Sequence, residues 1–176
     1  MRCPQARHPH EDTRTDNIFS GKVLETRIFG CRNSGECGGY VDDYKVLDVE
    51  RLNSDERKST GWCNRSVEHL AEHPKFREIV DSAKTMVLGL LRNAEPGEKQ
   101  FLGVRCKYGE LASVGTNRML ATFLQSRGVT VTSVFANGSD ENSAGSCGCI
   151  RCQGSQEMNL EAFERALDKW KLHWGR

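Results

Sequence analysis

The sequence has no long apolar run and no excess of charge of either sign. No stretch approaches the roughly eighteen apolar residues that a membrane-spanning helix needs, and 25 Lys and Arg stand against 24 Asp and Glu in 176 residues. The resulting net charge of +1 gives no global field that would attract nucleic acid or an anionic membrane. We therefore expect no membrane partner, and any RNA binding has to come from a local surface.

The first twenty residues also lack the apolar segment that is typical of a signal peptide. We expect residues 1–20 to be a disordered N-terminal tail and the protein to be cytoplasmic, with a nuclear or organellar location left open. In that setting the 8 cysteines are expected to be reduced thiols, some of them buried or binding a metal, rather than a disulfide framework.

The middle of the chain alternates between predicted strands and predicted helices. Runs of β-branched and apolar residues predict strands at 22–31, 44–49, 100–106 and 129–135. Apolar residues at three- and four-residue spacing predict a helix or helix pair at 64–92 and a helix at 113–127, which ends before Gly128. This succession predicts an α/β fold, a Rossmann-like three-layer domain with a parallel or mixed sheet, over residues 21–136.

Two segments follow this domain. Residues 137–157 form a Cys-rich loop with almost no core-forming side chains, which in a compact domain indicates binding or disorder. Residues 158–176 predict a C-terminal amphipathic helix that packs through one apolar stripe. The stripe consists of Leu160, Phe163, Leu167, Trp170 and Trp174.

The loop Cys106–Val114, with the sequence CKYGELASV, stands where open α/β sheets bind ligands. A glycine-containing loop there leads from the carboxyl end of a strand into a helix whose free N–H groups attract anions. Lys107 adds positive charge. A purely structural interpretation remains open, in which Cys106 is a core residue and Ser113 caps the helix.

The same loop resembles that of the C-terminal domain of the RapZ family of RNase adapter proteins. The family's loop reads Gly-Cys-Thr-Gly-Gly-x-His-Arg-Ser-Val, and this sequence matches it at Cys106, Gly109, Ser113 and Val114. The resemblance extends over about residues 22–135, and its further matches are Phe29, Gly30, Asp43, Asp48, Val49, Leu52, Thr60 and Gly61. The family's separate P-loop domain has no counterpart, because G-x-x-x-x-G-K-[ST] does not occur.

The resemblance implies a ligand-binding or regulatory domain whose ligands are RNA and a phosphorylated amino sugar. It also implies that a homo-oligomer is possible. The ligand-binding residues it predicts here are Cys106, Lys107, Gly109, Ser113, Asp48, Thr60 and Gly61.

The ligand loops also depart from the family. Leu111 and Ala112 replace the family's His-Arg, which removes a charged fork for phosphate, and Glu50 replaces a strand-end Arg. A phosphatase-type loop needs an Arg six residues after its cysteine, where this chain has Ala112. We therefore expect a non-catalytic domain, and an enzyme acting on a phosphate ester is the least favoured alternative.

Cys147, Cys149 and Cys152 form C-x-C-x-x-C, a spacing that lets thiolates converge on one Zn²⁺. A closed structural site needs a fourth ligand, for which Cys31 or Cys37 is a candidate. The alternative is that these are exposed or redox-active thiols. The runner-up function is therefore a zinc-stabilised protein-interaction module that has lost the ancestral ligand and binds a protein partner.

Overall fold

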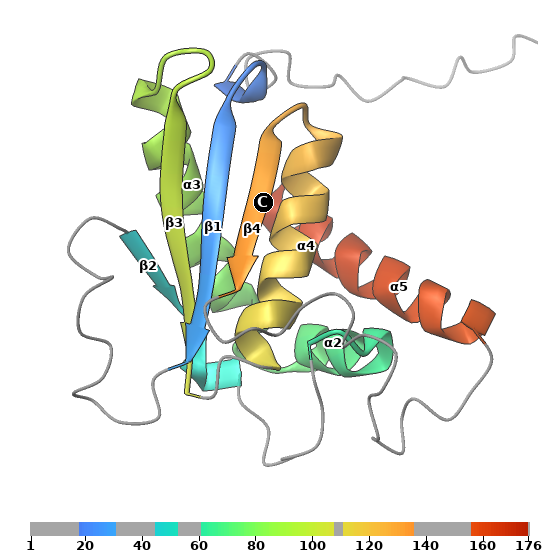
Figure 1. Cartoon of the computed structure of the whole chain (residues 1–176). Coiled ribbons are helices and arrows are strands. Elements are labelled where there is room, and N and C mark those ends of the chain that lie inside the picture. Colours follow the sequence, from blue (N-terminus) through green and yellow to red (C-terminus); the bar gives the residue numbers. More distant parts are fainter. Residues whose placement is uncertain (1–17, 31–44, 53–60, 108–110, 136–155, 176) are drawn as a thin grey trace, which may run out of the picture.

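The computed structural model describes residues 18–30, 45–52, 61–107, 111–135 and 156–175. Its elements are arranged as Figure 1 shows. In chain order they are β1 (Val23–Gly30), β2 (Lys45–Asp48), a 3₁₀ helix (Glu50–Leu52), α2 (Asn64–Glu72), α3 (Phe76–Asn93), β3 (Lys99–Cys106), α4 (Ala112–Ser126), β4 (Thr130–Phe135) and α5 (Gln156–Trp174).

The strands form one parallel sheet. Within the described part of the chain it has four strands in the order β2-β3-β1-β4, so β1 lies between the two later strands β3 and β4. Each neighbouring pair is parallel, as is expected where helices connect successive strands. The predicted α/β class, the Rossmann-like fold and the C-terminal helix are confirmed, and the sheet is parallel rather than mixed.

The core lies between the sheet and the helices. Side chains alternate between the two faces of a strand, and Leu24, Leu102 and Val104 on one face are fully buried in a single cluster with residues of α3, α4 and α5. The other face carries polar residues, among them Glu25, whose carboxylate accepts hydrogen bonds from Arg27 and Lys99. One face of the sheet therefore supplies most of its apolar packing.

The predicted helix or helix pair at 64–92 is two helices. The break falls at Pro74, because the residue before a proline is driven out of the helical region. His73 accordingly ends α2 in an extended conformation (φ −63°, ψ 137°), and its N–H donates to the Leu70 carbonyl at 3.1 Å. The 3₁₀ helix follows almost directly on β2.

The apolar stripe of α5 packs against other helices. Trp170 is fully buried, with its ring centroid 5.9 Å from that of Phe76 in α3, and the rings of Trp174 and Phe123 in α4 lie 4.7 Å apart. Trp170 and Trp174 lie in the core, as the predicted apolar stripe requires. Leu160, which the prediction placed in the same stripe, is 60% exposed.

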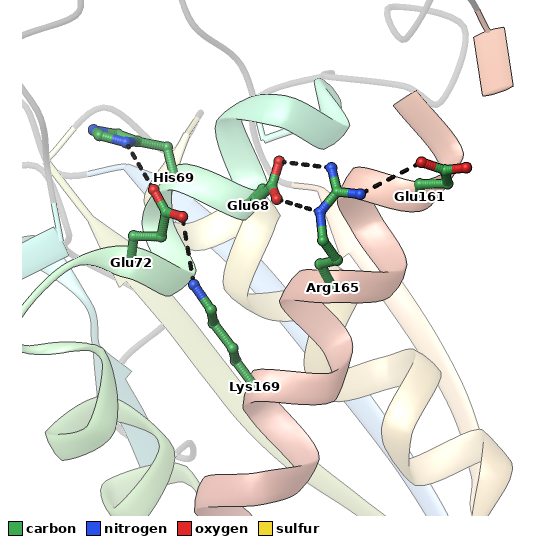
Figure 2. A network of polar contacts seen from close by, with 6 residues as sticks. All are labelled: Glu68, His69, Glu72, Glu161, Arg165 and Lys169. Atoms are coloured by element: carbon green, nitrogen blue, oxygen red, sulfur yellow. Dashed lines mark hydrogen bonds and ion pairs between the residues drawn. The ribbon is translucent and has the colours of Figure 1, made fainter. Parts of the chain in front are cut away.

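A network of ion pairs flanks the contact between α2 and α5 (Figure 2). The guanidinium of Arg165 donates to both carboxylate oxygens of Glu68, at 2.6 and 3.3 Å, and also reaches Glu161. Lys169 lies 3.5 Å from Glu72. Arg165, Lys169 and Glu72 are exposed and Glu68 is half-buried, so these pairs orient α5 rather than provide most of its stability.

None of the helices in the described part of the chain combines the length and the apolar character needed to cross a lipid bilayer.

Candidate functional site

The predicted site lies at the carboxyl edge of the sheet. Because the strands are parallel, their carboxyl ends share one edge, and the register pairs Gly30 with Cys106 and Asp48 with Arg105. In Figure 1 the start of α4 lies at this same end of the sheet. This is the position at which open α/β sheets generally bind ligands.

Cys106 and Ser113 are brought together there. The thiol of Cys106 donates a hydrogen bond to the hydroxyl oxygen of Ser113 at 3.2 Å, and both residues are almost completely buried. The bond joins the end of β3 to the first turn of α4. The interpretation of Ser113 as the helix cap is wrong, because the N-cap is Leu111.

The first turn of α4 is buried. Its N-cap residue, Leu111, makes no side-chain capping hydrogen bond, and Ala112, Ser113 and Val114 are at most 1% exposed. The first N–H groups of any helix have no partner inside the helix and carry a partial positive charge. Shielded from water, such donors attract an anion more strongly than they would at an exposed helix end.

Gly61 lies directly on this turn. A Cβ atom at position 61 would be 2.3 Å from the Gly115 nitrogen and 2.7 Å from the Leu111 oxygen, so only glycine fits. Arg118, one turn further along α4, fixes the segment by donating to the carbonyl oxygens of Gly61 (2.8 Å) and Trp62 (3.0 Å). Gly61 is thus in contact with the start of α4, where the predicted Cys106 loop ends.

Asp48 occupies the same edge but pairs with Arg105. Arg105 and Cys106 are consecutive in β3, so their side chains point to opposite faces of the sheet. Partial burial of Asp48 raises its pKa, but hydrogen bonds from the Arg105 side chain and the Glu50 N–H outweigh this and hold the pKa below its usual value. Asp48 is thus a charged, paired group on the other side of β3 from Ser113.

The remaining predicted residues are only partly described. Lys107 is exposed and follows directly on β3. Thr60 and Gly109 lie outside the described residues, as do all the predicted zinc ligands, Cys31, Cys37, Cys147, Cys149 and Cys152. The described ranges contain no group of three His, Cys, Asp or Glu side chains placed to hold a metal ion. The zinc site therefore stays a prediction.

Comparison of the sequence with protein-family models gives no match, and comparison with curated proteins gives none either.

A second polar cluster was not predicted from the sequence. Asn117 in α4 donates from Nδ2 to Ser133 Oγ in β4 at 2.9 Å, and Ser133 Oγ lies 3.0 Å from Thr26 Oγ1 in β1. Asn117 and Thr26 are almost completely buried, at positions where helix and strand periodicity would place apolar residues. Polar residues at core positions were therefore the signal that the sequence offered. The cluster borders a pocket between α4 and β4.

Proposed function

We propose that this chain is a non-catalytic ligand-binding domain, related to the C-terminal domain of the RapZ family, that binds a small phosphorylated ligand at the N-terminus of α4. The observation that carries the proposal is the buried first turn of α4, whose N-cap residue Leu111 makes no side-chain capping hydrogen bond and which packs on Gly61 beside the end of β3. Ser113 belongs to this turn, Cys106 bonds to Ser113 and Gly61 contacts the turn, and all three are predicted from the resemblance.

The chemistry of the turn favours an anion. Its N–H groups point along the helix axis toward the carboxyl edge of the sheet, and a phosphate oxygen accepts from such groups without needing a cationic side chain. Lys107 is exposed beside the turn and supplies the one positive charge of the predicted loop. Among phosphorylated molecules, the resemblance favours an amino sugar phosphate.

The state of Cys106 supports binding rather than catalysis. A nucleophilic cysteine acts as an accessible thiolate, usually beside a cationic partner. Cys106 is 1% exposed, and its thiol donates a hydrogen bond to the Ser113 hydroxyl. Ala112 has no guanidinium that would hold a phosphoryl group during transfer. The thiol therefore has a structural role, and it would have to break its hydrogen bond to Ser113 before it could act as a nucleophile.

The test is a calorimetric titration with glucosamine 6-phosphate at two salt concentrations. We expect saturable binding that weakens when Lys107 is replaced by Ala, because an exposed ion pair to the phosphate is lost. Lys171→Ala is the matched control, since Lys171 is also exposed but lies near the end of α5, where Trp174 packs on Phe123 far along α4 from its first turn. Absence of binding at millimolar ligand, or equal affinity in both variants, would contradict the proposal.

RNA binding rests on the resemblance alone and stays a prediction. It requires an affinity for a small structured RNA that falls steeply with salt, in proportion to the phosphates neutralised. An RNA signal that does not change between the two salt concentrations would count against it.

A further inference from the structure

A pocket of about 530 Å³ lies between α4 and β4, apart from the first turn of α4. Its wall includes Asn117 and Arg118 of α4, Ser133 and Phe135 of β4, Trp62, and Phe163 of α5. We propose that this pocket binds a planar heteroaromatic ring of the nucleobase type. The volume falls within the roughly 300–1,000 Å³ that is usual for small-molecule sites.

Flat groups from separate parts of the chain line the pocket. The rings of Trp62 and Phe135 have their centroids 5.2 Å apart, with an interplanar angle of 48°. The guanidinium of Arg118 lies 4.7 Å from the ring centroid of Phe163 and 5.5 Å from that of Trp62. Aromatic faces and guanidinium planes are the surfaces on which single nucleobases stack in proteins.

The wall also holds a buried amide that is only half satisfied. Asn117 is 1% exposed, and its Nδ2 is bonded to Ser133 while its Oδ1 has no partner among the described residues. If the amide oxygen and nitrogen are assigned the other way round, the group without a partner is an N–H donor instead of the oxygen acceptor. An unpaired buried amide is costly, and the edge of a nucleobase carries neighbouring donors and acceptors that can pair with it.

The charge of the pocket favours the ring rather than a phosphate. Arg118 is the one charged residue among the described residues that line it. Its guanidinium already donates to the oxygens of Gly61 and Trp62 and, at 2.8 Å, to Oδ1 of Asn64. These bonds hold the guanidinium of Arg118 in the wall of the pocket together with the Trp62 and Phe163 rings, a lining that suits a neutral planar ring.

Adenosine and guanosine are the probes, titrated into the full chain and followed by the indole ¹⁵N–¹H signals. The Trp62 signal is assigned from its loss in the Trp62→Phe variant. Trp62 borders the pocket, whereas Trp170 and Trp174 lie in the core and are 0% and 6% exposed. We expect a saturable shift of the Trp62 signal alone. Ribose, which has no ring system to stack, is expected to leave it unchanged.

Thr122→Phe locates the binding, with Thr85→Phe as its matched control. Thr122→Phe fills the pocket from a half-buried position of α4, and Thr85→Phe places the same change on the exposed face of α3. We expect Thr122→Phe to abolish the shift and Thr85→Phe to preserve it. Asn117→Leu, which removes the amide at similar volume, is expected to weaken binding about tenfold, the effect of one hydrogen bond.

No saturable shift at millimolar nucleoside would overturn the proposal, as would an equal response to ribose or a response that survives Thr122→Phe. Glucosamine 6-phosphate binding depends on the turn at Ser113 and on Lys107, so either proposal can fail without the other.

Discussion

At the scale of single residues, Gly61 is the described glycine at which an added Cβ would come closest to its neighbours. Gly61→Ala would place a methyl group against backbone atoms of α4, which cannot turn away as a side chain can. We expect the free energy of unfolding to fall by about 1–3 kcal/mol, together with weaker glucosamine 6-phosphate binding. Urea denaturation measures the first effect and calorimetry the second.

Gly89→Ala is the matched control. Gly89 lies inside α3, and among the described residues a Cβ there would meet the Lys45 side-chain nitrogen alone, at 3.7 Å. Alanine is the better helix former, so this variant is expected to gain about 0.5–1 kcal/mol. A Gly61→Ala variant as stable as the wild type would contradict the prediction, because it would show that the α4 backbone shifts away from the methyl group at little cost in free energy.

Glu25 links stability to pH. It is 8% exposed. Burial raises its pKa, but the hydrogen bonds and charges of Arg27 and Lys99 outweigh this and lower it below the ordinary value. A carboxyl whose pKa is lower in the folded state stabilises the fold above its unfolded pKa, about 4.3, and loses that contribution as pH falls through the folded pKa.

We therefore expect Glu25→Gln to be less stable than the wild type at pH 7 and the two to converge as the pH falls below about 4. Urea midpoints measured from pH 7 to pH 3 check this. A difference that stays constant over the whole range would show that the loss comes from packing and not from the charge.

At the scale of elements, α5 is held mainly by its buried tryptophans. Trp170→Ala removes the fully buried ring that contacts Phe76, and we expect a loss of about 3–5 kcal/mol in the free energy of unfolding. Leu172→Ala changes a side chain that is 54% exposed on the same helix, and its expected effect is within about 0.5 kcal/mol. Chemical denaturation of both variants compares them, and equal losses would mean that helix propensity and not packing dominates.

At the scale of the whole molecule, the predicted zinc site would join segments that are distant in the sequence. If Cys147, Cys149 and Cys152 bind Zn²⁺ with a fourth cysteine, purified protein should carry about one equivalent of metal, measured by elemental analysis. Cys149→Ser with Cys152→Ser should remove the metal and lower the melting temperature. Metal-free wild-type protein whose melting temperature is unaffected by chelator would exclude the site.

How far the sequence predicts the site differs from residue to residue. The order of strands and helices follows from periodicity and from Gly128, whose φ of +87° suits the chain reversal after α4. Gly61 and Ser113 were placed near one another only through the resemblance, because no local pattern relates positions 52 residues apart. The pocket at Asn117 was missed, because its lining residues come from four segments and share no local motif.

The sequence by itself determined the α/β class, the run of alternating elements and the amphipathic final helix, because each depends on periods of two or about 3.6 residues within a short window. The tertiary structure alone decided that β1 lies between β3 and β4, that Cys106 bonds to Ser113, and that Gly61 packs against the start of α4. These contacts depend on strand order and on packing between distant segments. Local periodicity fixes which face of an element is apolar, but not which element covers it.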